Sequence, residues 1–504
     1  MKALGRCLVV GLAVRVLWLS VRYLQHVPGV LRFQLESASV AFVVVGVALA
    51  LWTRIPVGLT GDAPSPSLGL GWTWCVWCLA AFVLYWPALH MGFLSDDFVL
   101  VERAQHFRLG AFNPESFRPI PIVIWGGILH IGGGATSIHT LNIALHGTNA
   151  FLTSRLTRSR VVDWRAAIFA GALLLVSPLG PEAVAWNSGV FDLMASALVL
   201  AAIALGRGYG EGHASAGRRQ ILVCAAAAAF LCKETAVVVG PLIVLDAVVR
   251  RVRTRQLYID AMAVTGAMVG VIGLRLALVS SAAKQPMTKY LVQRWLFGTF
   301  GSLVVPWHAD VLRSHSWAPI AGVVAVVTLT TMIFVNRQSA ERITLVAAGA
   351  LWALLATLPT ITMLFVASDL QGSRYLYLAS IGYAVSLTGA ASTASRAPQI
   401  LRRASVAALG LLLACGALGV RWHLRPWEEA GAVRDQVIAA RLALGSASGC
   451  QQLVLLDLPD NVRGAYVFRN GAEQALGVSP LPNDADVQRC SFRWDGQGFL
   501  SGRK

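Results

Sequence analysis

The chain has 504 residues, of which 56% are hydrophobic and 13% are charged, and its formal net charge is +17. A soluble domain carries about 25% charged residues, so half that fraction on so long a chain excludes a soluble globular protein. The basic residues fall in short clusters between apolar runs, which is the positive-inside pattern of membrane proteins and not a nucleic-acid-binding surface.

Residues 1–60 are predicted to form an N-terminal pair of transmembrane helices. The chain begins like a signal peptide, but it lacks a small-residue cleavage site, and Arg15 interrupts the apolar run. We therefore interpret the segment as a retained first span or an interfacial helix.

Residues 70–420 are predicted to form a membrane domain, because apolar runs long enough to cross a bilayer follow one another along it. Together with the first pair, about thirteen spans are expected, at the roughly 20 residues that each crossing needs. Residues 290–305 are an interfacial segment or a further span. The expected spans are 7–22, 37–52, 71–90, 137–156, 165–180, 188–206, 220–233, 234–250, 258–279, 317–335, 342–365, 375–393 and 404–420.

The arginine clusters fall in every second loop, so these loops are predicted to be cytoplasmic. The first large loop, residues 91–136, is then extracytoplasmic. Nearly all acidic residues of the membrane region share that side, with Asp192 just inside a span. The acidic residues are Asp96, Asp97, Glu102, Glu115, Glu182, Glu234, Asp310 and Asp369.

Asp96 and Asp97 directly follow a span, within GFLSDDFVLV. An adjacent acidic pair is usually a solvated loop start. Here apolar residues flank the pair on both sides and hold it at the membrane surface, and other ionisable residues converge on the same side.

Those other residues are Glu182, Asp192, the Lys233-Glu234 pair and Arg374, with Arg118 in the first loop. A charged side chain near the membrane interior is costly unless it is paired or solvated, so either mutual pairing or a polar active-site cavity explains the set, and the cavity is favoured. A carboxylate there can act as a general base or hold a divalent cation such as Mg²⁺ or Mn²⁺ through Asp96 and Asp97. Arginine and lysine at the same depth suit the phosphate of a lipid-linked sugar.

His139, Asn142 and His146 lie at i, i+3 and i+7, on one face of a predicted span. Hydrogen bonding between helices is the favoured interpretation, so these residues are candidates for supporting the site. Zinc binding is the alternative, and no third ligand is evident.

Residues 421–504 are polar and are predicted to form a small extracytoplasmic α/β domain. A helix is expected at 427–444, a strand at 452–458 and a further helix from Arg463. Cys450 and Cys490 are candidates for a disulfide on an oxidising side of the membrane, and two free thiols are the alternative.

Six segments occur in order along residues 70–395: GFLSDDFVLV, SFRPIPIVI, SIHTLNIALH, SPLGPEAVAWNSGVFDLMAS, FLCKETAVVVGPL and RYLYLASIGY. Together they resemble the GT-C glycosyltransferases, in particular the transmembrane O-mannosyltransferases with tetratricopeptide repeats and their bacterial relatives. The repeats are absent here, and residues 421–504 take their place. The resemblance implies an all-α polytopic membrane fold of GT-C type.

The resemblance also implies roles for the charged residues. Asp96 or Asp97 matches the catalytic position, and Glu182 and Asp192 match a second acidic motif, in which Ser177 and Val190 replace the usual His and Arg. Lys233, Glu234 and Arg374 match positions near the donor phosphate, and Arg118 is a further candidate. The donor in this family is a polyprenyl-phosphate sugar, and transfer inverts the configuration.

The predicted function is therefore transfer of a sugar, by a hexosyl- or mannosyltransferase-like enzyme, from a polyprenyl phosphate to a protein, lipid or glycan outside the cytoplasm. The alternatives are a transporter or flippase of lipid-linked sugars, and a polysaccharide polymerase or ligase. Transporters are often built from repeats with charges near the midplane, and no repeat is evident here. The predicted location is a bacterial inner membrane, with the site and the C-terminal domain on the periplasmic side.

Overall fold

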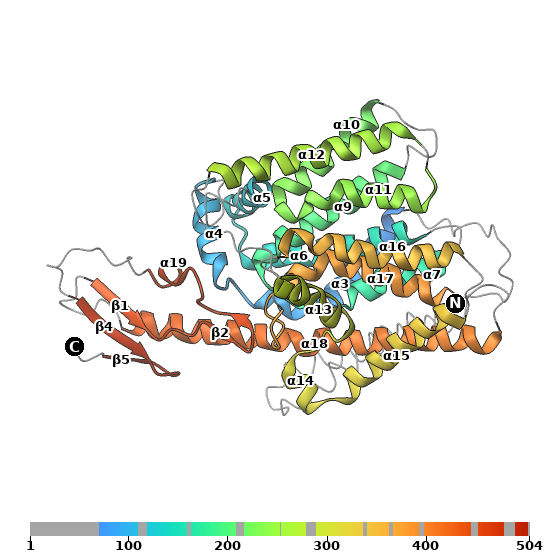
Figure 1. Cartoon of the computed structure of the whole chain (residues 1–504). Helices are drawn as coiled ribbons and strands as arrows, with labels where there is room; N and C mark the ends of the chain where they lie inside the picture. The colour runs from blue at the N-terminus through green and yellow to red at the C-terminus, as the bar shows by residue number, and fades with distance from the viewer. Residues whose placement is uncertain are drawn as a thin grey trace.

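The computed structural model describes residues 70–108, 118–158, 162, 164–207, 216–252, 254–278, 289–335, 340–361, 366–392, 398–444, 452–477 and 489–501. The predicted N-terminal pair of spans and Cys450 lie outside these ranges. Within them the chain is a bundle of helices with a small strand-containing region at one end (Figure 1).

The helices of the bundle follow one another with few breaks. They are α3 Leu70–Tyr85, η1 Trp86–His90, α4 Asp96–Gln105, α5 Pro119–His130, α6 Ala135–Thr157, α7 Trp164–Leu175, α8 Pro181–Ala185, η2 Asn187–Gly189, α9 Val190–Arg207, α10 Ala216–Cys232, η3 Glu234–Val238, α11 Val239–Val249, α12 Arg255–Leu278, α13 Lys289–Val304, α14 Ala309–Ser314, α15 Trp317–Val335, α16 Ala340–Thr357, η4 Leu358–Thr360, η5 Ser373–Leu376, α17 Tyr377–Ala391 and α18 Gln399–Ala443.

Four helical segments within the described residues are long and apolar enough to cross a membrane: Gly71–His90, Asn187–Arg207, Arg342–Thr360 and Gln399–Ala443. Three shorter apolar helices accompany them, at Pro119–His130, Ala166–Leu175 and Trp317–Ile333. The chain is therefore an integral membrane protein. The expected number of about thirteen spans stays a prediction, since it depends in part on residues outside the described ranges.

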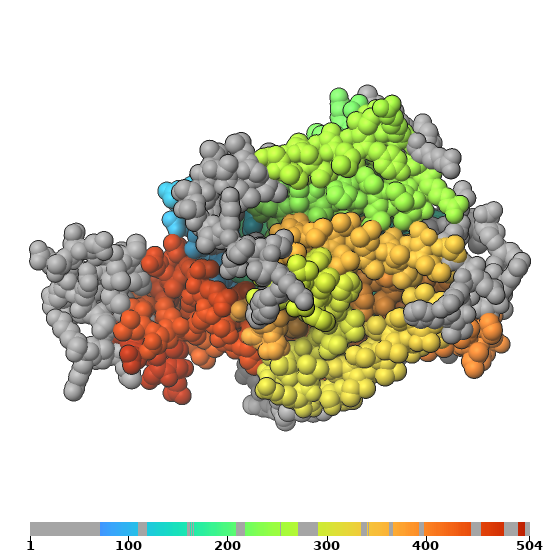
Figure 2. All heavy atoms as spheres, in the orientation of Figure 1, coloured from blue at the N-terminus to red at the C-terminus, as the bar shows by residue number. Residues whose placement is uncertain are grey.

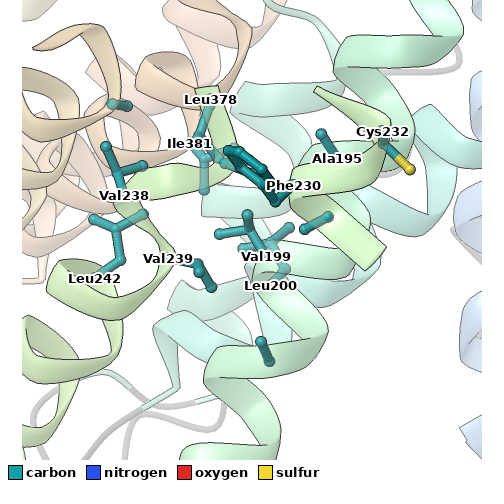
Figure 3. Close-up of a cluster of buried hydrophobic side chains, with 14 of the residues drawn as sticks. Ala195, Val199, Leu200, Phe230, Cys232, Val238, Val239, Leu242, Leu378 and Ile381 are labelled. Atoms are coloured by element: carbon teal, nitrogen blue, oxygen red, sulfur yellow. The ribbon is translucent and has the colours of Figure 1, made fainter. Parts of the chain in front are cut away.

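Apolar side chains from distant parts of the sequence hold the bundle together. In one cluster, Val199 and Leu200 of α9 meet Phe230 of α10, and Leu378 and Ile381 of α17 join them (Figure 3). Inside a bilayer the lipid tails are as apolar as these side chains, so the cluster stabilises the bundle through close van der Waals packing and not through transfer from water.

Two glycines let α16 and α17 approach closely. A Cβ atom on Gly349 would lie 2.6 Å from the carbonyl oxygen of Gly382, and a Cβ on Gly382 would meet that of Gly349 at the same distance. Small residues at such crossings are typical of membrane helix packing, because they bring the two backbones into van der Waals contact.

Helix α18 is 45 residues long and runs across the lower half of Figure 1, from the bundle into the C-terminal region. The predicted boundary at 420/421 falls inside this helix, and so does the helix predicted at 427–444. Pro426 lies within α18, where its missing N–H and its ring disturb one turn of the backbone ladder.

The C-terminal region contains two small sheets and a short helix. Strand β1 (Gln452–Leu456) pairs in parallel with β4 (Arg489–Trp494), with Leu453 opposite Cys490, and β4 pairs antiparallel with β5 (Phe499–Ser501). Strands β2 (Asn461–Val462) and β3 (Ala465–Tyr466) form an antiparallel hairpin, followed by helix α19 (Ala472–Leu476). Because Cys450 is outside the described residues, the Cys450–Cys490 disulfide stays a prediction.

The helix predicted to begin at Arg463 is wrong. Arg463, Gly464 and Gly471 have φ angles of 47°, 88° and 74°, in the left-handed region that a right-handed helix does not contain. They make tight turns on either side of β3 and delay the helix to Ala472. In Figure 2 this C-terminal region, in red, covers one end of the helical bundle.

Candidate active site

The turn that carries the two aspartates has a strained backbone. Ser95, the residue before α4, is fully buried and has φ 48° and ψ −117°, backbone angles that residues other than glycine rarely adopt. Such a residue costs about 1–3 kcal/mol and persists only where its surroundings hold it in place, which is common at functional sites. With these backbone angles at Ser95, the chain makes a sharp turn immediately before α4.

Asp97 is fully buried, and protein donors surround its carboxylate. It accepts hydrogen bonds from the backbone N–H of Leu94 (3.0 Å), from the backbone N–H of Ser188 (2.9 Å) and from the Ser188 hydroxyl. Burial raises the pKa of Asp97 to about 7, against the lowering effect of these hydrogen bonds. Asp97 therefore ties α4 to the turn formed by η2 and is not directed to an outside ligand.

Asp96 has a different environment, although it is the adjacent residue. Its side chain is half-buried, and the carboxylate Oδ1 accepts a hydrogen bond from the Asn470 amide at 2.6 Å and from the Ser95 hydroxyl at 3.4 Å. Successive helical residues point about 100° apart, so one of two adjacent aspartates faces inward and the other faces the surface. Of the pair, Asp96 is the carboxylate that an incoming molecule can reach.

Glu182 and Arg374 form a buried acid–base pair. Arg374 follows the left-handed Gly372, and its backbone N–H donates to Glu182 Oε2 at 3.1 Å, while the Ser373 hydroxyl donates to the same oxygen at 3.0 Å. The Arg374 guanidinium lies 3.7 Å from Glu182 Oε1 and stacks over the Trp186 ring, 4.2 Å from its centre. Burial raises the pKa of Glu182, and the charge of Arg374 opposes that rise.

Lys233 and Asp192 form a second buried pair, between the end of α10 and the first turn of α9. The Lys233 ammonium also lies over the Tyr375 ring, 5.0 Å from its centre. Both side chains are less than a tenth exposed, so each depends on the other for charge compensation.

Arg118 and Glu234 form a third pair, 2.9 Å apart, in which both side chains are about a quarter exposed. Lys233 lies within electrostatic range of both Arg118 and Arg374. Three cationic side chains from separate segments thus lie near one another, and each forms an ion pair with a carboxylate. Their role as phosphate ligands stays a prediction.

The site is tightly packed around Glu182. The cavity beside it, lined also by His308, Asp369 and Ser373, has a volume of about 20 Å³, which is room for about one water molecule. An anion that approaches Arg374 must compete with Glu182, the carboxylate that already pairs with this guanidinium.

His139, Asn142 and His146 are all buried on α6 and hold neighbouring segments. Asn142 donates to the backbone carbonyls of Trp186 (3.0 Å) and Asn187 (3.3 Å), and His139 Nε2 lies 3.2 Å from the Gly92 carbonyl. The His146 ring donates to one carbonyl, that of Leu175, and its other nitrogen lies 2.7 Å from the Tyr377 hydroxyl. These contacts hold the neighbouring segments in place. They do not direct His139, Asn142 and His146 to a common point where a metal ion could bind.

The aspartates do not fit a divalent cation as a pair. Asp97 points into protein donors and Asp96 points away toward Asn470, so the two carboxylates do not share a ligand position. Over the described ranges, no group of three or more His, Cys, Asp or Glu side chains is placed to hold a metal ion.

Several residues that build the site were not predicted from the sequence. Asn187 and Ser188 follow Trp186 in the AWNSG segment, and their Asn-Ser-Gly sequence is a turn signal that was available. A Cβ on Gly189 would lie 1.9 Å from the Ala183 carbonyl, so only glycine fits there. Asn470 had no such signal, because it lies outside residues 70–395, which contain all the motifs of the resemblance.

Comparison with curated proteins gives one relevant match. The chain is 30% identical over 189 aligned positions to the protein O-mannosyl-transferase Tmtc2 of Drosophila melanogaster. The predicted resemblance to the membrane O-mannosyltransferases is confirmed. The match covers 32% of this chain and 20% of that protein, so this chain spans about one fifth of its relative. No family model matches the chain.

Two solved structures show weaker similarity. The crystal structure of ArnT from Cupriavidus metallidurans bound to undecaprenyl phosphate is 12% identical with a TM-score of 0.44, covering 81% of this chain and 85% of that one. The arabinosyltransferase EmbB from Mycobacterium smegmatis is 14% identical with a TM-score of 0.35, covering 72% of this chain and 34% of that one. TM-scores below 0.5 do not by themselves establish a common fold.

Proposed function

We propose that the protein is a membrane glycosyltransferase that moves a sugar from a polyprenyl phosphate to the hydroxyl group of an extracytoplasmic acceptor. The observation that carries this proposal is the division of the aspartate pair. Asp97 is buried and saturated with protein donors, while Asp96 is accessible and is held at the start of α4. The sequence similarity to an O-mannosyl-transferase supports sugar transfer as the chemistry.

In the proposed reaction, Asp96 is the general base. Its carboxylate takes the proton of the acceptor hydroxyl as that oxygen forms a bond to the anomeric carbon of the donor. The bond between the anomeric carbon and the phosphate oxygen breaks, and its electron pair stays with the polyprenyl phosphate. A single displacement of this kind inverts the anomeric configuration.

Arg374, Lys233 and Arg118 are proposed to stabilise the charge that develops on the leaving phosphate. Each cation has a carboxylate partner, so the phosphate must replace a carboxylate as it binds. The Arg118–Glu234 pair is the most exposed of the three, with side chains 23% and 25% exposed, and we expect it to open first. Glu182 and Asp192, predicted as catalytic, act in this proposal by holding Arg374 and Lys233 in position.

The proposed location is a bacterial inner membrane with Asp96 on the periplasmic side. The positive-inside distribution of the arginine clusters supports this orientation, because it places the loop containing Asp96 opposite the basic loops. The acceptor, which is a protein, a lipid or a glycan, lies on the same side.

The test uses full-length protein in membrane vesicles supplied with undecaprenyl phosphate carrying radiolabelled mannose, glucose or arabinose. Label is followed into protein, lipid and glycan fractions, and release of free undecaprenyl phosphate is measured alongside. Asp96→Asn is expected to lower transfer by at least about a hundredfold, the usual contribution of a general base. Asp457→Asn, at an exposed carboxylate paired with Arg493 in the C-terminal sheet, is the matched control and is expected to keep wild-type transfer.

Full transfer by Asp96→Asn would rule out the proposal that Asp96 is the base. Movement of intact lipid-linked sugar across the vesicle membrane, without release of undecaprenyl phosphate, would instead identify a transporter or flippase.

A further inference from the structure

The C-terminal region reaches directly onto the turn that carries Asp96. We call residues 465–471, together with Arg434 of α18, the C-terminal clamp. The backbone N–H of Ser95 donates to the Val467 carbonyl at 2.8 Å, and the Asn470 N–H donates to the Ser95 hydroxyl at 3.3 Å. The strained residue Ser95 is therefore held by a part of the chain more than 370 positions away.

Arg434 holds the segment just before that turn. Its guanidinium donates to the carbonyls of Met91 (2.7 Å) and Phe93 (2.8 Å), and it occupies the space where a side chain at Gly92 would lie. Gly92 has φ 71°, so the backbone there adopts a conformation that favours glycine. The clamp thus fixes the chain on both sides of Leu94.

Close packing brings the clamp against α4. A Cβ on Gly471 would lie 2.6 Å from the Ser95 carbonyl and 3.0 Å from the Phe98 Cβ, so glycine allows the two segments to touch. The Phe98 and Phe468 rings stack with their centres 6.3 Å apart. These contacts leave Asn470 directly over the start of α4.

Asn470 supplies both hydrogen bonds that orient Asp96, one directly and one through Ser95. The Asn470 amide donates to Asp96 Oδ1 at 2.6 Å, and the Asn470 backbone N–H fixes the Ser95 hydroxyl that donates to the same oxygen at 3.4 Å. Both bonds occupy Oδ1 and leave Oδ2 as the oxygen available to a substrate proton.

We infer that the C-terminal clamp completes the active site and that Asn470 is a positioning residue for Asp96. The inference rests on the proposed function, because it assigns Asn470 a role through a carboxylate that the proposal makes the base. It gives residues 465–471 a role in the active site, although the sequence motifs that carry the resemblance to glycosyltransferases all lie within residues 70–395.

The test compares Asn470→Ala and Asn470→Asp with the control Asn461→Ala. Asn461 is an exposed asparagine of the same region whose side chain contacts Asp460 and Gly464 and not Asp96. Full-length proteins are assayed in vesicles with undecaprenyl phosphate carrying the sugar that the wild type uses best, and kcat, the donor KM and the pH–rate profile are measured.

Asn470→Ala is expected to lower kcat about tenfold with an unchanged donor KM. This factor corresponds to about 1.4 kcal/mol, close to the lower end of what one hydrogen bond to a charged group contributes. Asn470→Asp is expected to lower kcat further and to move the acid limb of the pH–rate profile to higher pH, because a second carboxylate beside Asp96 disfavours its ionised form. A loss of packing alone would not move the pH profile.

Wild-type kcat and an unchanged pH profile in both Asn470 variants would overturn the inference. If Asp96→Asn abolishes transfer at the same time, the proposed function stands and only the role of Asn470 fails. If Asp96→Asn transfers normally, the proposed function fails first.

Discussion

Asp97 has its pKa raised from the ordinary 3.8 to about 7 by complete burial, which makes the stability of the protein depend on pH in a predictable direction. For an acid with a raised pKa in the folded state, that state binds the proton more tightly than the unfolded chain does. The free energy of unfolding therefore falls as pH rises from about 4, and this fall ends above pH 7.

Across pH 5 to 8 this effect lowers the free energy of unfolding by about 2–3 kcal/mol, at about 1.36 kcal/mol for each pH unit below the folded pKa. For a chain of this size, we expect a change of about 2–5 °C in melting temperature. Asp97→Asn resembles the protonated side chain and has no proton to lose, so the variant is expected to lack this pH dependence.

The assay is thermal unfolding of purified wild type and Asp97→Asn in detergent at pH 5, 6, 7 and 8. The two proteins are expected to melt together at pH 5, and the variant is expected to melt higher at pH 8. Ser188→Ala removes a hydroxyl donor to the Asp97 carboxylate. Between pH 5 and pH 8 the melting temperature of this variant is expected to fall further than that of the wild type. Parallel curves for wild type and Asp97→Asn would show that Asp97 is ionised throughout and would refute this reasoning.

Two further predictions follow from the packing of the site. Lys233→Met should destabilise the protein by about 3–5 kcal/mol, because it leaves Asp192 buried without its partner. The double variant Lys233→Met/Asp192→Leu should recover most of the melting temperature while sugar transfer stays low, and wild-type transfer by the double variant would remove Lys233 from the phosphate site. Gly189→Ala should yield little folded protein, because its Cβ would lie 1.9 Å from the Ala183 carbonyl. Gly301 has open space around it, so the control Gly301→Ala should express and melt like wild type. Equal yields of folded protein for the two variants would contradict the packing at η2.

The sequence predicted that the charged residues share one side of the membrane, and that orientation stays a prediction. The structure shows that they are neighbours, because it brings Glu182 to Arg374 and Lys233 to Asp192. The partners could not be assigned from sequence, because residues such as Glu182 and Arg374 are separated by many helices whose packing decides the contact.

The distinction between Asp96 and Asp97 was also beyond the sequence. Adjacent residues in a first helical turn differ by about 100° in direction, and which one faces inward depends on the elements packed against them. Here Ser188 of η2 captures Asp97 and Asn470 of the C-terminal clamp captures Asp96. Neither contact leaves a local pattern in the sequence.

The central claim is tested most directly by mass spectrometry of surface glycans, glycolipids and secreted proteins. The samples come from a strain that lacks the gene and from the same strain carrying wild type, Asp96→Asn or the control Asp457→Asn. The proposal predicts that deletion removes one sugar residue from a defined molecule, that wild type and Asp457→Asn restore it, and that Asp96→Asn does not. Restoration by Asp96→Asn, or unchanged masses in the deletion strain, would contradict it.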